Sequence, residues 1–297
     1  MVRRILGLRA GRVAVGILSA IALLAILGPV LAPQDPLATR PETLAGPSWS
    51  HWLGTDYLGR DVFSRLLEGS RTSVLGSVQV ALIALVVGAV PGILSVYLGR
   101  AFEWLTLRVA DTLIALPFLV FAVAVTALLG NGLPQAMLVV GVLVSPLFFR
   151  VSRAATLAVA RSQYVEAALI SGGSVGWLVR RHVWGKVLPP IAVALAQTIG
   201  TGFIVVSSLT FLGIGVQPPE PTWGGLLASD LGYLAYQPWA PAVPAALIMA
   251  TVWGSNLLAD AIRDVSGEAG RTLVNSRRAR ARRLDSTEPL TAGGTTR

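Results

Sequence analysis

The chain has 297 residues, of which 54% are hydrophobic and only 13% charged, against roughly 25% charged residues in a soluble domain. Several uncharged runs are long enough to cross the roughly 30 Å hydrocarbon core of a bilayer, so composition predicts an integral membrane protein. The absence of cysteine excludes disulfide frameworks, thiolate metal sites and cysteine nucleophiles, and two distant histidines, His51 and His182, disfavour a histidine metal centre.

The N-terminal part begins with a basic segment, residues 1–12, followed by the first predicted span at 13–32. A basic start and an apolar core also fit a signal peptide. The apolar run is long for one, and cleavage after Ala32 would place Pro33 next to the scissile bond. We therefore expect an uncleaved transmembrane helix.

A polar segment of mixed charge, residues 33–71, separates this span from the next. The second span is predicted at 72–99, with a kink at Pro91-Gly92. After a short charged turn at 100–108, an apolar stretch from Asp111 to about Leu129 is the third.

The second half of the chain continues this alternation. The fourth span is expected from Gln135 toward Ala160, the fifth at 187–216 and the sixth at 238–259. The polar stretch 161–186 and the loop 217–237 lie between them. The segment 72–262 is thus predicted as a five-helix core, followed by a basic tail at 263–297 that we expect to be disordered.

The distribution of charge predicts the orientation. Six spans place both termini on one side, and the segments assigned to that side (1–12, 100–108, 150–186 and 263–297) hold 20 Lys and Arg residues, against 4 in the opposite segment 33–71. Because basic residues collect in cytoplasmic loops, both termini are predicted to be cytoplasmic. The tail motif RRARARR could contact nucleic acid or anionic lipid, but topology explains its charge and we expect no nucleic-acid partner.

The stretch Tyr164–Pro190 is the longest polar interruption between apolar blocks. Its pattern predicts two short helices joined at Gly172-Gly173, since glycine readily ends a helix. Two readings remain open on these residues alone: a connector lying on the membrane surface, or a cytoplasmic docking helix for a soluble partner. Glu166-Ala167-Ala168 followed by Gly172 favours docking, because small side chains permit close approach of another protein.

This stretch resembles the EAA loop of permease subunits of ABC importers. More specifically, the chain resembles the C-type permease of the peptide/nickel importer family. The motifs that carry this resemblance follow the family's order and cover most of residues 50–264. They are GTDYLGRDVFSRLLEGSRTS (54–73), RRHVWGKVLPP (180–190), LTFLGIGVQPPEPTWGGLL (209–227) and PWAPAVPAALIMATVWGSNLLADAIRD (238–264). One departure is Trp184-Gly185, which stands where the family usually has Leu-Pro.

The resemblance implies a type I importer permease with six transmembrane helices in a bacterial inner membrane. It implies a homologous second permease, two cytoplasmic ATPase subunits and an extracytoplasmic substrate-binding protein as partners, besides membrane lipid. It also implies the contact residues. Those expected at the ATPase are Glu166, Ala167, Ala168, Ser171, Gly172, Gly173, Arg180 and Arg181. Those expected at the binding protein are Thr55, Asp56, Asp61, Gln217, Pro218 and Pro219. For the first three of these, a structural cap on the external face is the alternative.

Polar groups within the spans could line a translocation path, and Ser207, Thr210 and Asn256 are the candidates. Asp111 and Asp260 are ionisable and near span ends, where exposure, or pairing with Arg108 and Arg263 respectively, would explain them. No catalytic residue, bound cofactor or metal is expected in this chain, which has no GxxxxGK[ST] phosphate loop. ATP and magnesium would be used by the partner ATPases.

Two other classes of protein compete with this interpretation. A secondary transporter would bind ions at mid-membrane on broken helices, and an intramembrane hydrolase would need a catalytic pair inside the spans. The lack of central charges and the ordered motifs disfavour both. The resemblance implies peptides as the substrate, with nickel or another small solute as the alternative.

Overall fold

The structure, a computed structural model, describes residues 1–130, 132–160, 162 and 184–285, with side chains up to Gly267. Regular secondary structure in these ranges is helical, apart from one isolated bridge between Thr55 and Asp61, which confirms the all-α class. The helices are α1 (Val2–Ile5), α2 (Arg9–Leu31), α3 (Val62–Leu94), α4 (Arg100–Ala115), α5 (Phe118–Leu129), α6 (Leu133–Ala160), α9 (Trp184–Phe211), α10 (Trp223–Leu231) and α11 (Trp239–Asp285).

Five helices in the described residues are long and apolar enough to cross a membrane, and α4 with α5 makes a sixth if the pair is one broken span. The two halves are bent by 99°, where one continuous apolar segment was predicted. The break falls at Leu116, which is extended at ψ 139°, and Pro117. Proline pushes the preceding residue out of the helical region and donates no hydrogen bond, so the helix ends there.

Two helices start earlier than hydropathy predicted, and one continues further. Helix α2 begins at Arg9 rather than 13, and α3 at Val62 rather than 72. Helix α3 starts there because Asp61 caps it, accepting a hydrogen bond from the Ser64 amide at 2.8 Å. Helix α11 continues as far as Asp285, where a disordered tail from 263 was expected.

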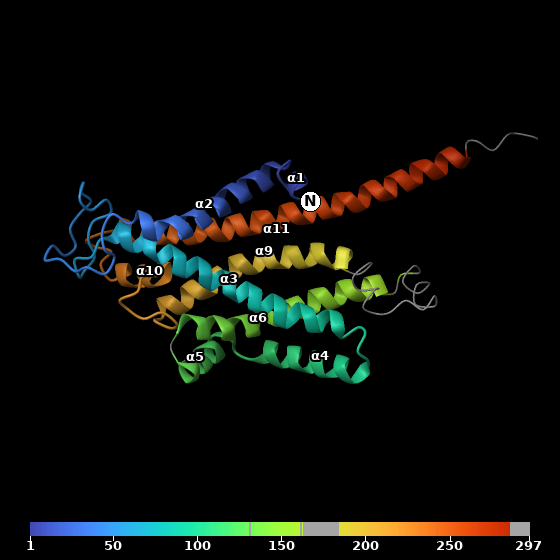
Figure 1. The fold of residues 1–297 in the computed structure, drawn as a ribbon, viewed down its shortest axis with the longest axis horizontal. Coiled ribbons are helices and arrows are strands. Elements are labelled where there is room, and N and C mark those ends of the chain that lie inside the picture. The colour runs from blue at the N-terminus through green and yellow to red at the C-terminus, as the bar shows by residue number, and fades with distance from the viewer. Residues whose placement is uncertain (131, 161, 163–183, 286–297) are drawn as a thin grey trace, which may run out of the picture.

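The long helix α3 lies at the centre of the bundle and contacts α2, α6 and α9 (Figure 1). Helix α11 runs along α2 and α9, whereas α4 and α5 lie on the far side against α6. This leaves α9 between α6 and α11, which is the arrangement that creates the face described below.

Small residues allow α3 and α6 to approach closely. A Cβ added at Gly88 would lie 2.1 Å from the Ser145 carbonyl oxygen, and one added at Gly92 would lie 2.6 Å from that of Phe149. Small residues four positions apart are typical of tight helix contacts in membranes, where van der Waals packing drives association. Since α6 ends next to residues 161–183, this contact fixes the helix that leads to the predicted docking stretch.

The two ends of the bundle differ in what they carry. We call the loop end the one with residues 32–61, the segment 212–238 and α10. The opposite end carries the N-terminus, the α3–α4 turn and the end of α6 (Figure 1).

Candidate translocation and docking sites

A compact cap covers the loop end and is held by buried polar side chains. The Asp56 carboxylate accepts hydrogen bonds from the amides of Leu58 and Arg60, both at 2.9 Å, and from Arg60 Nε at 2.7 Å. Asp61 lies 2.9 Å from His51 Nδ1 besides capping α3. Thr55 donates to the Glu42 carbonyl at 2.6 Å. The cap is thus an ordered element in which each of these groups has a partner.

This burial corrects one part of the predicted docking surface. Thr55, Asp56 and Asp61 are only 0%, 5% and 3% exposed, so they support the cap from inside and offer no contact to an approaching protein. The structural alternative therefore describes them. Gln217, Pro218 and Pro219 are exposed on the neighbouring loop, and they stay the candidates for docking.

Helix α10 and the start of α11 fasten the cap to the bundle. The fully buried Trp223 donates from its indole Nε1 to the Leu66 carbonyl at 3.0 Å, and its ring lies 5.5 Å from that of Phe203. Gln237 Nε2 donates to the carbonyls of Ala45 at 2.7 Å and Thr55 at 3.0 Å. Segments far apart in sequence are thereby joined into one unit.

Asp230, on α10, is the carboxyl of this end with a perturbed pKa. Burial raises its pKa from 3.8 to about 6, partly opposed by a hydrogen bond from Ser229. Its Oδ2 has no hydrogen-bond partner among the described residues. Asp230 was not predicted from the sequence, because the residues next to it in the chain do not indicate that its carboxyl group is buried.

A polar face runs along the spanning helices on the side of α9 that no helix of the described chain covers. Gln197, Thr201 and Ser208, at spacings of four and seven, are partly or fully exposed there, and Asn256 and Asp260 are exposed on α11. A cavity of about 550 Å³ opens on the same side between α6, α9 and α11, with Gln197 and Arg263 in its lining. We call this surface the polar face.

Two of the three predicted path residues do not belong to the polar face. Ser207 and Thr210 are 8% and 3% exposed, and the Thr210 hydroxyl donates to the Val206 carbonyl at 3.0 Å. They pack against α10, where a Cβ on Gly224 would lie 2.2 Å from the Ser207 carbonyl oxygen. Asn256 does face outward. Gln197 was missed in sequence, although its helical spacing to Thr201 was a usable signal.

The charged groups near the span ends are paired. Asp260 lies 3.2 Å from Arg263, as expected. Asp111 is exposed, which is one of its two expected explanations, and it pairs with Arg150 of α6 at 3.0 Å in place of the alternative partner Arg108. Arg108 instead lies over the Trp104 ring, 5.8 Å from its centroid. A second pair, Arg153 with Glu103, also joins α6 to α4.

Comparison with known proteins identifies the family. Residues 48–268 match the family described as binding-protein-dependent transport system inner membrane component. The chain belongs to this family. It is therefore a membrane permease component of a transport system, which fits its several spanning helices.

The individual relatives are also permease proteins of transport systems. The chain is 38% identical over 244 residues to the probable D,D-dipeptide transport system permease protein DdpC of Escherichia coli, covering 82% of each chain. It is 32% identical over 249 residues to the dipeptide transport system permease protein DppC of Alkalihalophilus pseudofirmus, covering 84% of this chain and 82% of the relative. It is 35% identical over 219 residues to the glutathione transport system permease protein GsiD of Pectobacterium atrosepticum, covering 74% and 73%.

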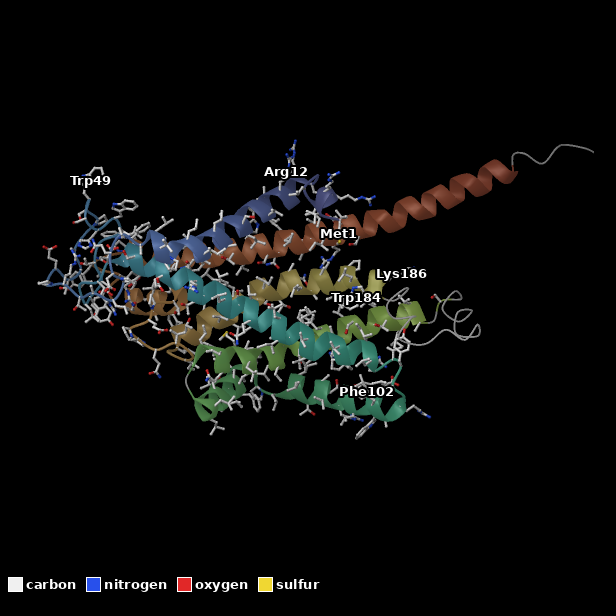
Figure 2. The ribbon with its side chains drawn as sticks, viewed as in Figure 1. Met1, Arg12, Trp49, Phe102, Trp184 and Lys186 are labelled. Atoms are coloured by element: carbon white, nitrogen blue, oxygen red, sulfur yellow. The ribbon has the colours of Figure 1, made fainter. Side chains whose placement is uncertain are left out.

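The predicted ATPase-docking residues of this permease lie outside the described residues. This applies to Glu166, Ala167, Ala168, Ser171, Gly172, Gly173, Arg180 and Arg181. The structure does describe both flanks, with α6 up to Ala160 and α9 from Trp184 onward. The unusual Trp184-Gly185 is helical and belongs to α9. Figure 2 shows Trp184 and Lys186 at the opposite end of the permease from Trp49.

Within the described residues, no group of three or more His, Asp or Glu side chains could hold a metal ion. The histidine of the cap, His51, is instead engaged with Asp61.

Proposed function

We propose that this permease forms half of the translocation path of an ATP-driven bacterial importer of short peptides. In this arrangement it lies in the inner membrane beside a homologous second permease. Two cytoplasmic ATPase subunits use ATP and magnesium, and an extracytoplasmic binding protein delivers the substrate. The proposal of a peptide substrate rests on the relatives, which are named as dipeptide and glutathione transport permeases.

The observation that carries the proposal is the polar face. An amide or carboxylate facing lipid at membrane depth is costly, and such groups usually face a bundle interior or a water-filled path. Thr201, Asn256 and Asp260 are exposed, and Gln197 is partly exposed, on one side of two adjacent helices. A second permease covering this side would leave these groups lining an aqueous path between the two subunits.

The charge distribution supports the proposed orientation. Arg3, Arg4, Arg9 and Arg12 lie at the opposite end of the bundle, where the described part of α6 ends and that of α9 begins. Because basic residues favour the cytoplasmic side, we place the loop end outside the cytoplasm. The exposed Gln217, Pro218 and Pro219 would then meet the binding protein, and Glu166 to Gly173 would seat in the ATPase.

The test is reconstitution of the whole transporter in lipid, with substrate-stimulated ATP hydrolysis measured over a panel of peptides and a nickel chelate. Peptide import that stops without the ATPase subunits supports the proposal. Transport that continues without them contradicts it, and stimulation by the nickel chelate alone would replace the peptide substrate.

Substitution tests the polar face itself. Gln197→Leu and Asn256→Leu should lower peptide import several-fold while the ATPase subunits still copurify, because the path loses polar groups that a moving peptide can exchange for water. Ile26→Leu, at a position on α2 that is 69% exposed, is the matched control. Import unchanged in both polar-face variants would show that these residues line no path.

A further inference from the structure

A second cavity, of about 320 Å³, lies at the loop end between the start of α3, the end of α9 and α10. Its lining includes Tyr57, Arg60, Arg65, Phe211, Glu220 and Ser229. The volume is at the lower end of the roughly 300–1,000 Å³ found for ligand pockets. Its lining shares no residue with that of the cavity on the polar face, so the two cavities are distinct.

The floor of this pocket is unusual because two arginines are buried side by side. Arg60 and Arg65 are 4% and 5% exposed. Arg60 is held by Asp56 at 2.7 Å. Arg65 Nη1 donates to the carbonyls of Pro36 at 3.1 Å and Pro219 at 3.3 Å, which fixes the guanidinium in place. A positioned guanidinium is well suited to bind a carboxylate through two parallel hydrogen bonds.

Arg65 retains unused capacity for such a bond. Its Nε is buried and makes no hydrogen bond among the described residues; the nearest carboxylate oxygen, Asp56 Oδ2, is 3.6 Å away and already accepts from Arg60. A buried donor without an acceptor is costly. An acceptor that enters the pocket would relieve that cost.

The two buried arginines of the pocket share one carboxylate partner. Asp56 is the one carboxylate within 4.0 Å of them among the described residues. Asp230 lies nearby but forms no ion pair in the described part of the chain. Arg65 thus has no carboxylate of its own in contact, and in surroundings of low dielectric constant an incoming anion is attracted more strongly than in water.

The position of the pocket connects it to the polar face. Phe211 is exposed in the pocket lining and lies seven residues beyond Ile204 on α9. Ile204 is itself exposed, on the side of α9 that carries Thr201 and Ser208. Residues seven apart share a helix face. A solute leaving the pocket toward the membrane would thus meet the polar face next.

We propose that this pocket receives the terminal carboxylate of a short peptide at the start of translocation, with Arg60 and Arg65 as the carboxylate-binding residues. Glu220, the exposed carboxylate in the lining, has the charge that suits the ammonium group of the same peptide. This inference rests on the proposed function, because it assigns a recognition site to the proposed peptide substrate.

The experiment uses the absence of cysteine in this chain. Ala228→Cys places a thiol in the pocket lining, and Ala235→Cys places one on the exposed loop after α10, outside that lining. In the reconstituted transporter without binding protein, labelling of this subunit by an anionic and a cationic methanethiosulfonate reagent is followed over time. The same reactions are repeated with a dipeptide and with its C-terminal amide.

The expected result has two parts. The anionic reagent should react several-fold faster than the cationic one at Ala228→Cys but not at Ala235→Cys. The free-acid dipeptide should protect Ala228→Cys, and protection by the amide should need roughly 10- to 100-fold higher concentration, the range for losing a hydrogen bond to a charged group. In the Ala228→Cys background, Arg65→Gln should remove this difference, whereas Arg65→Lys should keep part of it.

Several results would overturn the inference. They are equal protection by acid and amide, no protection by either, or no preference between the reagents. Protection by the binding protein alone, without peptide, would assign the pocket to an acidic side chain of that protein. Because labelling does not require transport, the pocket can fail this test while peptide import succeeds, and import can fail while the pocket binds the dipeptide.

Discussion

The close contact between α3 and α6 predicts the effect of a single methyl group. In Gly88→Ala the new Cβ would lie 2.1 Å from the Ser145 carbonyl oxygen and 2.8 Å from Phe148 Cβ, whereas ordinary contact begins at 3.4 Å. The shortfall of 1.3 Å to the oxygen involves backbone, which no side-chain rotation can relieve. The helices must therefore separate, and overpacking of this kind costs about 1–3 kcal/mol.

A matched control isolates this cost. Gly16→Ala, in α2, also replaces a helical glycine, but its Cβ would have nothing within 4 Å. Both variants gain the helix propensity of alanine, worth up to about 1 kcal/mol, so the difference between them measures the clash. We expect thermal unfolding of the purified transporter to show Gly88→Ala less stable than Gly16→Ala by about 1–3 kcal/mol. Equal stability within about 0.5 kcal/mol would refute the packing argument.

Two further predictions concern the loop end. Asp230→Asn should stabilise the permease above about pH 6. Burial raises the pKa of Asp230 in the folded state from 3.8 to about 6, so between pH 4 and pH 6 the folded state keeps a proton that the unfolded chain releases. The wild type therefore loses up to about 3 kcal/mol of folding free energy as pH rises through that window. Thermal unfolding at several pH values checks this, and identical pH profiles of the two proteins would contradict it. Trp223→Phe should cost about 1 kcal/mol, because it removes the indole hydrogen bond to Leu66 but keeps a ring beside Phe203; a loss as large as that of Trp223→Ala, about 3–5 kcal/mol, would show that the bond is not what matters there.

Sequence patterns predicted the helical spans well because hydropathy depends only on local composition. Features that depend on a distant segment were less predictable. Ser207 and Thr210 are polar residues in a span, but α10 covers them, and no local pattern shows where α10 packs. The partner of Asp111 was not foreseen for the same reason, since Arg150 is 39 residues away whereas Arg108, the alternative considered, is close in sequence. The break at Leu116-Pro117 was visible in the sequence, yet the continuous hydropathy of the segment masked it.

The inner and outer residues of the cap are under different constraints. The charged residues of GTDYLGRD face inward, where Asp56 pairs with Arg60, Asp61 pairs with His51, and both carboxylates accept hydrogen bonds from backbone amides. Their identities are therefore constrained by folding of the loop, whatever protein lands on it. The outer surface is free of that constraint: Trp49 is 100% exposed and stands out from the cap (Figure 2). In the proposed orientation, two permeases could therefore share this motif and still bind different binding proteins, because the motif fixes the fold of the cap and leaves its outer surface to exposed side chains such as Trp49.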